Sequence, residues 1–382
     1  MTPLLPPLSL YIHIPWCVKK CPYCDFNSHE VKSDTPESAY IDTLLLDLKK
    51  DLQRFQVKRP IQSIFIGGGT PSLFSPESFE RLLTGIKQQI VLTDNVEITL
   101  EANPGTFESH KFAEFRALGI NRLSIGIQTF DDTLLKRLGR VHNAAEAQKA
   151  AEIAHLAGFD NFNLDLMFGL PDAEKLTSQQ DILTAISLKP QHISFYQLTL
   201  EPNTFFYKYP PQLPSDDEVF ITQQACQALL AEHGFQQYEI SAYSKPGRQC
   251  QHNVNYWQFG DYLGIGAGAH GKISLELPNR ILRSSKPKHP EQYLRDYAEG
   301  SVTTAILPTE LPLEFLMNQL RLKQGFSAAH FQARTGLSCN SLEPALSLCL
   351  KEQLLDCRDN YYSCSEQGWN FLDSLLEKFI LL

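Results

Sequence analysis

The sequence predicts an α/β protein with a parallel sheet and a small, mostly helical C-terminal domain. Short β-type runs alternate with helix-like stretches over the first half of the chain, and such alternation requires parallel strands joined by crossover helices. Polar and glycine-rich residues follow one strand after another, as in sheets whose sites lie at the carboxyl ends of the strands. The alternation stops near residue 202, and helix-like segments dominate beyond residue 307.

Length and composition limit the classes of protein to which this chain can belong. A chain of 382 residues suffices for one large domain and a smaller one, and 43% hydrophobic with 20% charged residues is ordinary for a packed globular protein. The formal net charge of -9 argues against a nucleic-acid partner, because such binding depends on basic groups. No segment has the length of a membrane span and no signal peptide is visible, so we expect a cytoplasmic protein with at most peripheral membrane contact.

Six β-type runs are expected to form the sheet. They lie at residues 10–14, 64–66, 96–100, 122–125, 162–166 and 192–196. Between them, apolar residues at helical spacing predict helices over residues 40–55, 76–90 and 144–157. Six such βα units suit either a barrel or an open, doubly wound sheet.

The second half of the chain is organised differently. A proline-rich stretch leads to a helix-like run over residues 216–233, and the glycine-rich segment 260–271 reads as a continuation packed on the barrel. Helices and a short hairpin around Asp359 and Asn360 predict a winged-helix-like module whose slightly acidic charge favours packing or partner contact over DNA binding. We expect three parts: a core barrel over 1–235, an extension over 236–305 and a C-terminal domain over 306–382.

Three of the nine cysteines, Cys17, Cys21 and Cys24, fall together after the first strand. In a reducing compartment they are thiols or metal ligands. This spacing holds three thiolates for three irons of a cubane and leaves the fourth iron open. Structural zinc usually has four protein ligands in two separated pairs, which His13 and His29 do not complete. The motif therefore predicts a [4Fe-4S] cluster, with zinc as the weaker alternative.

The same stretch carries a resemblance to a known family. Residues 11–26, YIHIPWCVKKCPYCDF, resemble the signature of the radical-SAM proteins of the HemW/HemN family, and the similarity covers nearly the whole chain. The resemblance implies a partial (β/α)6 radical-SAM barrel with a HemN-type C-terminal helical domain. It also implies S-adenosylmethionine (SAM) on the open iron, where one electron from the cluster cleaves SAM to a 5'-deoxyadenosyl radical.

The resemblance further implies a set of SAM-contacting residues. The glycine turn at residues 67–69 lets backbone approach the methionyl part. Glu101 can accept from the amino group, Arg140 can pair with the carboxylate, and Gln128 and Asp165 can bond ribose hydroxyls. Singly, such residues are more often turns, solvated charges or helix caps, but all of them follow successive strands. The full set is Tyr11, Tyr23, Gly68, Gly69, Thr70, Glu101, Gln128, Arg140, Asp165 and Thr199.

Two positions distinguish branches of the family. HemN proteins, the oxygen-independent coproporphyrinogen III oxidases, carry a further cysteine two residues after the third, whereas Phe26 stands here. Residues 252–257, HNVNYW, match the HNxxYW element associated with heme binding in the HemW branch. The imidazole of His252 can ligate heme iron, while Tyr256 and Trp257 offer flat apolar surface. The alternative for a lone histidine beside aromatic residues is a hydrogen-bonded structural role.

The resemblance thus implies a heme chaperone, with heme and a heme-accepting protein as its partners. Coproporphyrinogen decarboxylation in heme biosynthesis is the alternative that Phe26 puts in doubt, and the SAM-contacting set argues against a cluster that is only structural. Cys250 is a second candidate ligand for heme iron, although buried, unreactive cysteine is commoner. The basic residues of the segment 280–288 are expected in a solvated loop, with heme propionates as the alternative contact; they are Arg280, Arg283, Lys286 and Lys288.

Overall fold

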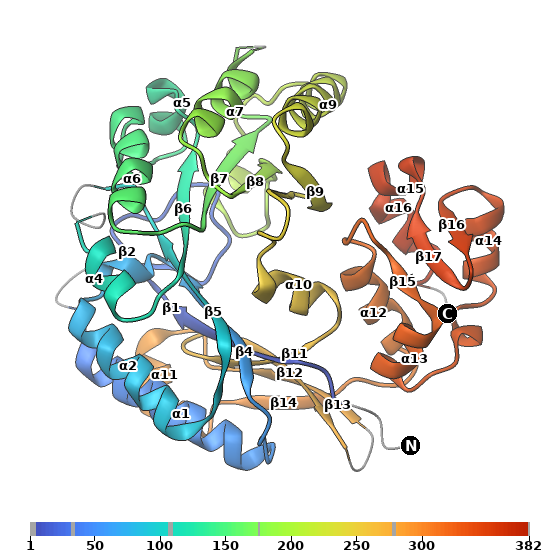
Figure 1. The fold of residues 1–382 in the computed structure, drawn as a ribbon, viewed down its shortest axis with the longest axis horizontal. Coiled ribbons are helices and arrows are strands. Elements are labelled where there is room, and N and C mark those ends of the chain that lie inside the picture. The colour runs from blue at the N-terminus through green and yellow to red at the C-terminus, as the bar shows by residue number, and fades with distance from the viewer. Residues whose placement is uncertain (1–4, 32–34, 106–109, 175, 277–279, 381–382) are drawn as a thin grey trace.

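One curved sheet forms the framework of the protein. The computed structural model describes residues 5–31, 35–105, 110–174, 176–276 and 280–380. The main sheet has twelve strands in the order β14-β13-β12-β11-β1-β4-β5-β6-β7-β8-β10-β9. Figure 1 shows it bending round from β14 to β9, with the short helix α10 (Gln251–Trp257) inside the curve. This is the partial barrel that the family resemblance implies.

The six strands predicted from the sequence form the parallel centre of this sheet and pair in chain order. Nearly every residue of the first strand is buried, as expected where helices cover the outside of a sheet and other side chains fill its inside. Their observed bounds are β1 (Leu8–Ile14), β4 (Ile61–Gly68), β5 (Leu92–Ala102), β6 (Arg122–Gln128), β7 (Phe162–Phe168) and β8 (His192–Gln197).

Further strands extend the sheet at both edges. The glycine-rich segment 260–271 does not merely pack on the barrel: β11 (Asp261–Ile265) pairs in parallel with β1, and β12 (His270–Leu275) follows it antiparallel. The sequence lacks a clear strand pattern there because glycine is depleted in strands. The remaining edge strands are β13 (Arg280–Ser285), β14 (Val302–Ala305), β9 (Gln236–Glu239) and β10 (Ala242–Ser244).

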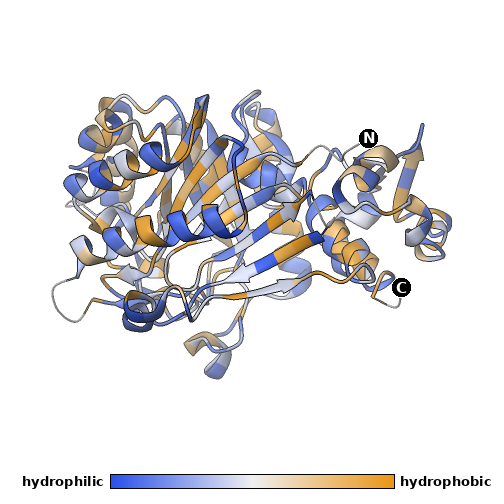
Figure 2. Cartoon of the chain, turned by 90° about the horizontal axis from the view of Figure 1, so that it is seen from below, coloured by the Kyte–Doolittle hydropathy of each residue, from blue (hydrophilic) through white to orange (hydrophobic). Residues whose placement is uncertain are grey.

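Helices cover the outside of the sheet, including the four that the sequence predicts. Three of the four begin with a capping side chain, as at Asn143 and Ser215, each of which completes a capping box with a glutamate three residues later. Figure 2 shows hydrophobic and hydrophilic residues mixed along the outer helices, the pattern of helices that bury one face. The predicted helices are α1 (Glu37–Arg54), α2 (Pro76–Gln89), α6 (Ala144–Leu156) and α9 (Asp216–Glu232).

Shorter elements complete the barrel. The helices are α4 (Phe112–Ala117), α5 (Asp132–Arg137), α7 (Thr177–Ser187), α8 (Phe205–Lys208) and α11 (Pro290–Asp296), with a 3-10 turn at η1 (Pro71–Leu73). Within the described parts of the chain, no helix is both long and apolar enough to cross a membrane.

The C-terminal segment forms a separate three-stranded sheet, in the order β15-β17-β16, with helices around it. Asp359 and Asn360 both have positive φ, 51° and 60°, and form the two-residue hairpin turn predicted from the sequence. The order helix, strand, two helices, hairpin agrees with a winged-helix-like module. The elements are α12 (Leu311–Gln319), β15 (Phe326–Ser327), α13 (Ala328–Thr335), η2 (Cys339–Leu342), α14 (Ala345–Lys351), β16 (Leu355–Arg358), β17 (Tyr361–Cys364), α15 (Glu366–Asn370) and α16 (Leu372–Glu377).

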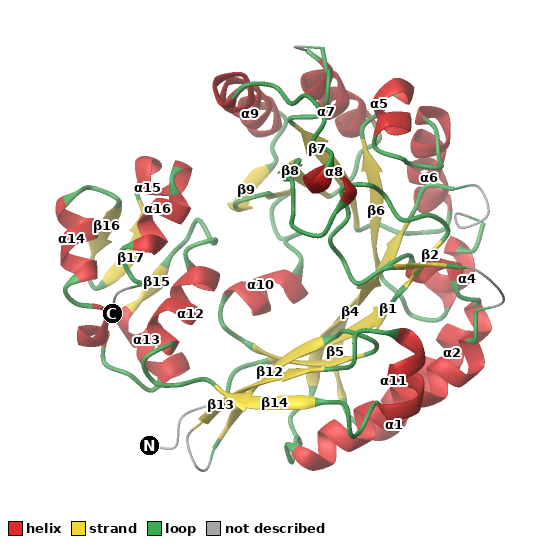
Figure 3. Ribbon diagram, turned by 180° about the vertical axis from the view of Figure 1, so that it is seen from behind, coloured by secondary structure: helices red, strands yellow, loops and turns green. Residues whose placement is uncertain are grey.

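This C-terminal module packs beside α10 and the barrel extension (Figure 3). Its hydrophobic core includes Phe259 and Ile281 from the preceding segment. The Arg321 guanidinium also bonds Glu239 Oε1 on β9 at 3.0 and 2.6 Å. The module therefore contacts the same part of the barrel that carries the HNVNYW element.

Candidate functional site

The three clustered cysteines lie on one loop beyond the carboxyl end of β1. Two short strands, β2 (Trp16–Cys17) and β3 (His29–Glu30), pair in parallel and fix the two ends of this loop. A backbone hydrogen bond from Cys24 N to Cys21 O, 3.1 Å long, forms a turn between them. The loop is thus closed on itself at the edge where the parallel strands end.

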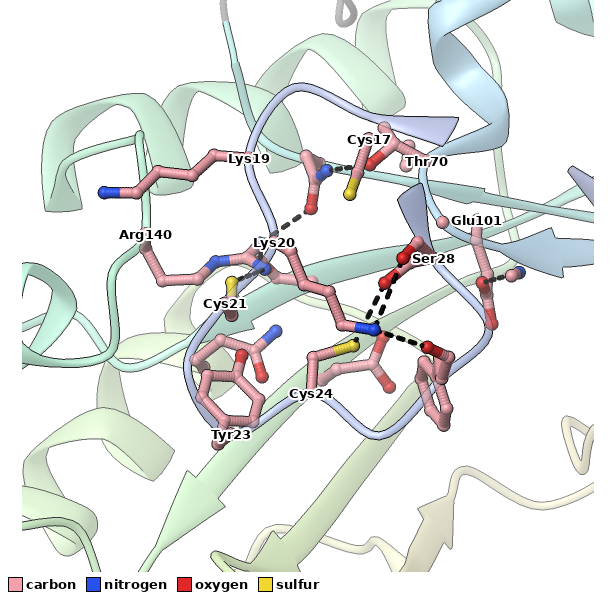
Figure 4. A pocket seen from close by; sticks show the side chains of 18 of the residues that line it. Cys17, Lys19, Lys20, Cys21, Tyr23, Cys24, Ser28, Thr70, Glu101 and Arg140 are labelled. Atoms are coloured by element: carbon pink, nitrogen blue, oxygen red, sulfur yellow. Dashed lines mark hydrogen bonds between the residues drawn. The ribbon is translucent and has the colours of Figure 1, made fainter. Parts of the chain in front are cut away.

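The thiols of the loop line a cavity of about 360 Å³ (Figure 4). Cys17 Sγ donates to a backbone carbonyl at 3.8 Å, Cys24 Sγ lies 3.6 Å from Ser28 Oγ, and Arg140 Nη1 lies 3.8 Å from Cys21 Sγ. Burial raises the pKa of Cys17 to about 11 and also raises the pKa of Cys24. Both are therefore thiols at neutral pH without a metal, and ligation would release their protons.

A cubane cluster suits this donor set better than a single metal ion. In the part of the chain that the structure describes, no three His, Cys, Asp or Glu side chains converge closely enough to hold one ion. A [4Fe-4S] cluster does not require such convergence, because each thiolate binds a different iron. Three thiols spaced around one loop and facing one cavity fit the predicted cluster.

The wall opposite the cysteines is built from the ends of β4 to β7 and the loops after them. Their parallel arrangement brings the ends of these strands to one edge of the sheet. Eight of the predicted SAM-contacting residues line this cavity: Tyr23, Gly68, Gly69, Thr70, Glu101, Gln128, Arg140 and Asp165.

One side of the cavity is acidic. Burial, and then the neighbouring Asp165, raise the pKa of Glu101 to about 7, while Gly68 N donates to its Oε2 at 3.0 Å. Burial also raises the pKa of Asp165, although Asn163 Nδ2 and Ser124 Oγ donate to its carboxylate at 2.8 and 3.0 Å. Two partly buried carboxyl groups, neither of them in an ion pair among the described residues, favour a ligand that brings an amine or hydroxyl groups.

The other side of the cavity is basic. Arg140 Nη2 donates to Asn103 Oδ1 at 2.6 Å and to the Gly126 carbonyl at 2.7 Å. Asn103 Nδ2 in turn donates to Thr70 Oγ1 at 2.8 Å. These contacts hold the guanidinium between the cysteine loop and the strand ends, where it can pair with a ligand carboxylate.

Backbone geometry at the strand ends is unusual. Gln128 has φ of 72°, rare for a residue with a side chain, at a shift in the register between β6 and β7. Its Oε1 accepts a hydrogen bond of 2.7 Å from the Tyr196 hydroxyl. Strained backbone of this kind is concentrated at ligand sites, and here it directs the Gln128 side chain into the cavity.

The glycine turn after β4 is required by the cysteine loop itself. A Cβ at Gly69 would lie 2.5 Å from the backbone oxygen of Trp16, and Gly69 N donates to Ile14 O at 2.8 Å. Gly68 has φ of 120°, a conformation that favours glycine. The sequence interpretation assigned this turn to close approach by SAM, and the structure adds close approach by the loop that carries Cys17.

A second cavity, of about 860 Å³, adjoins the first. Lys20, Phe26, Gly68 and Glu101 line both, so the two share a wall. The rest of its lining is rich in aromatic rings, together with three histidines: Tyr11, Phe65, Tyr256, Trp257, Tyr262, His13, His252 and His270.

Two of the predicted SAM-contacting residues lie apart from the other eight. Tyr11 lines the second cavity, where its hydroxyl lies 2.9 Å from His13 Nδ1. Thr199 is exposed and lines neither cavity. Because β8 ends at Gln197, Thr199 belongs to the loop beyond the strand rather than to the strand end.

His252 lies on α10 and is buried against the second cavity. Burial, and then the nearby Arg122, lower the pKa of His252 to about 3, so its imidazole is neutral, the form that ligates metals. Cys250 donates its thiol hydrogen to Glu97 Oε1 at 3.6 Å, and burial raises its pKa to about 12. A thiol held in this way is a poor alternative ligand for iron.

Comparisons with known proteins identify the family of the chain. Residues 11–176 match the model of the radical SAM superfamily, and residues 306–371 match that of the HemN C-terminal domain. The chain is 51% identical to "Heme chaperone HemW" of Haemophilus influenzae over 99% of both chains, and 48% identical to that of Escherichia coli over 98% of this chain and 99% of the relative. The chain belongs to the HemW family of radical-SAM proteins.

More distant relatives of this HemW-family chain share its architecture. The bovine "Radical S-adenosyl methionine domain-containing protein 1, mitochondrial" is 35% identical over 96% of this chain and 86% of the relative. The solved structure of coproporphyrinogen III oxidase (HemN) from Escherichia coli superposes with a TM-score of 0.83 at 21% identity, covering 99% of this chain and 91% of that one. At 21% identity, this superposition shows that the two proteins share a fold.

The basic segment of this HemW-family chain differs from the solvated loop expected from the sequence. Lys286 is buried and pairs with Asp47 at 2.5 Å and Asp51 at 2.8 Å on α1, and Arg283 forms an ion pair with α12. The expectation of a solvated side chain is therefore wrong for Lys286 and for Arg283, because each is ion-paired with a helix of the fold. Lys288, in contrast, is exposed and lines the second cavity.

Several cavity residues were missed by the sequence interpretation. Asn103 and Tyr196 follow or end predicted strands, and Ser124 lies inside one. The rule that polar residues at strand ends form the site, applied to every strand, would have found the first two. Ser124 carries no such signal, because a single serine in a strand is usually only a small buried side chain.

Proposed function

We propose that this chain is a heme chaperone that binds heme in the second cavity and passes it to an acceptor protein in the cytoplasm. The observation that carries the proposal is the pair of adjoining cavities, one lined by the three cysteines and one by aromatic residues and His252. The names of the two bacterial relatives, both called heme chaperones, support it.

In this proposal the first cavity holds the resident cofactors. Cys17, Cys21 and Cys24 would ligate a [4Fe-4S] cluster, which supplies one-electron chemistry when bound together with SAM. The chain's own residues orient the ligand: Glu101 accepts from an amino group and Arg140 pairs with a carboxylate. Gln128 and Asp165 complete the set of acceptors for ribose hydroxyls, and Tyr23 closes the cavity beside them.

The second cavity has the chemistry that a heme needs. Its aromatic walls offer apolar surface to the macrocycle, and the neutral imidazole of His252 offers a ligand to the iron. Lys20 and Lys288 also line it, and both are exposed, so they supply cations at its mouth for the two propionates. Tyr11, which the sequence predicts to contact SAM, lines this cavity and not the first.

Porphyrinogen decarboxylation is the second candidate function, because the chain shares the fold of HemN. Phe26 argues against it. The residue is 58% exposed and lines both cavities, at the position where the oxidase branch carries a cysteine. A phenyl ring offers apolar contact to a macrocycle and has no group that exchanges a proton.

A heme titration tests the proposal. Cluster-reconstituted protein is titrated anaerobically with hemin while the Soret band is recorded, alongside His252→Ala and the control His233→Ala, an exposed residue at the end of α9. We expect saturable binding, at least about tenfold weaker in His252→Ala because an iron ligand is lost, and unchanged in the control. Equal binding by all three proteins would reject His252 as the ligand.

An enzyme assay separates the two functions. The same protein is incubated anaerobically with coproporphyrinogen III, SAM and a reductant, and the porphyrinogens are separated by chromatography. We expect no protoporphyrinogen from protein that binds both SAM and heme. Catalytic formation of that product would instead establish the oxidase function.

A further inference from the structure

The orientation of His252 is set from inside the barrel by residues outside the HNVNYW element. We propose that Glu97 on β5 and Ser63 on β4 are positioning residues that hold His252 for ligation of heme iron. The inference rests on the proposed heme function and concerns how that ligand is fixed. Glu97 holds the backbone of α10, and Ser63 holds the imidazole ring.

Glu97 caps α10 from another element. The N-cap residue Cys250 makes no capping hydrogen bond with its side chain, which leaves the first N–H groups of the helix without a partner from their own segment. The Glu97 carboxylate accepts from Gln251 N and from His252 N, both at 3.2 Å. It also accepts from the Cys250 thiol at 3.6 Å. One carboxylate therefore fixes three consecutive residues, including the backbone of His252.

The cap is buried and electrically compensated. Glu97 is 6% exposed and Arg122, its neighbour in the barrel, is 2% exposed. A carboxylate at that depth needs both hydrogen bonds and a nearby cation. Burial opposes the charged form of Arg122, but the negative charge of Glu97 helps to raise the pKa of Arg122 above its usual value. The start of α10 is consequently tied to the interior of the barrel through the Glu97 carboxylate.

Ser63 fixes the imidazole ring. Its Oγ lies 3.3 Å from His252 Nδ1 and 2.7 Å from Ser9 Oγ. Ser9 Oγ accepts from Asn255 Nδ2 at 2.9 Å, so a chain of hydrogen bonds leaves α10 at Asn255 and returns to it at His252. Among the described residues, Nε2 of His252 has no hydrogen-bond partner, and the ring lines the second cavity.

This chain of hydrogen bonds has two proton arrangements. In one, Ser9 donates to Ser63, Ser63 donates to Nδ1 of His252, and the hydrogen of the neutral ring lies on Nε2. In the other, Nδ1 donates to Ser63 and Ser63 donates to Ser9, which leaves the Nε2 lone pair facing the cavity. Only the second arrangement ligates iron, so heme binding selects the state in which Ser63 accepts from His252.

Vibrational spectroscopy of the heme complex tests this inference. The full-length protein is loaded with heme and reduced, and the Fe–His stretch is recorded by resonance Raman for wild type, His252→Ala, Ser63→Ala, Ser63→Thr and Glu97→Gln. Ser244→Ala, a buried strand hydroxyl, and Glu37→Gln, another carboxylate that bonds across elements, are the matched controls. All variants are first compared by thermal unfolding and iron content.

We expect Ser63→Ala to shift the stretch to lower frequency, because Nδ1 loses its acceptor, and Ser63→Thr to restore it. Heme affinity should fall about 10–100-fold in Ser63→Ala and Glu97→Gln, as for other partners of metal-ligating histidines, and stay unchanged in the controls. If His252→Ala abolishes the stretch while Ser63→Ala and Glu97→Gln retain the wild-type spectrum and affinity, the positioning role is rejected and the heme function stands. A wild-type spectrum from His252→Ala rejects His252 as the iron ligand, and the positioning role with it, while heme binding through another residue stands.

Discussion

Glu101 is one of the four residues shared by the linings of the two cavities. It is bonded by Gly68 N at 3.0 Å and has a pKa raised to about 7 by burial and by Asp165. A carboxyl group with this pKa is partly protonated at neutral pH, and a bound amine would favour its ionised form. Its charge therefore depends on what occupies the first cavity.

The pH dependence of SAM binding follows from this pKa. Since Glu101 is ionised above about pH 7 and the ionised form attracts the SAM ammonium, affinity should rise between pH 6 and pH 8. Glu101→Gln should bind about 10–100-fold more weakly at pH 8, the loss expected for a charge-assisted hydrogen bond of about 1.5–3 kcal/mol, with a flat profile. Equilibrium binding at both pH values measures this, with the exposed Glu152→Gln as control.

Among the elements, α1 and the strand that ends at Ser285 are joined by a buried ionic cluster. Lys286 Nζ contacts Asp47 and Asp51, and the Tyr293 hydroxyl donates to Asp47 Oδ2 at 2.8 Å. Burial raises the pKa of Asp47 to about 6 even though Lys286 opposes the shift. One cation thus holds two carboxylates in the interior and fixes the barrel extension to the first helix.

Lys286→Met should remove this link. It leaves two buried carboxylates without a cation, which costs about 3–5 kcal/mol of unfolding free energy, whereas Lys288→Met on the surface should change it by less than about 0.5 kcal/mol. In the variant, burial without the lysine raises the pKa of Asp47 and of Asp51 in the folded state. The folded protein then binds protons more readily than the unfolded protein, so the loss of unfolding free energy is smaller at pH 5 than at pH 8. Urea unfolding at both pH values measures this; a loss that does not change with pH would contradict the ionic explanation.

At the scale of the whole molecule, the sequence predicts the repeated part of the fold and the part of the site built on it. The six central strands and the cysteine loop follow from alternation and spacing. The outer strands β9 to β14 do not, because strand formation there depends on pairing and packing that the local sequence does not show. For the same reason the sequence could not show that Tyr11 faces the second cavity, that Thr199 faces neither, or that Lys286 is buried.

One contact between the C-terminal module and the second cavity is made by Arg321. Arg321 bonds Glu239 Oε1 at 2.6 Å, with side-chain exposures of 31% and 5%, and its guanidinium lies 4.6 Å above the ring of Trp257, which lines the cavity. A cation over an indole contributes about 0.5–2 kcal/mol. The module therefore stabilises one wall of the proposed heme site from outside the barrel.

Arg321→Ala should weaken heme binding about 2–10-fold by releasing Trp257 and lower the unfolding free energy by about 1–3 kcal/mol by leaving Glu239 unpaired. Iron content should not change, because the cysteine loop lies on a different part of the barrel. Arg358→Ala, an exposed arginine on β16, is the control from the same module. If Arg321→Ala lowers stability but binds heme as wild type does, Trp257 holds its position without the module, and the C-terminal contact serves folding alone.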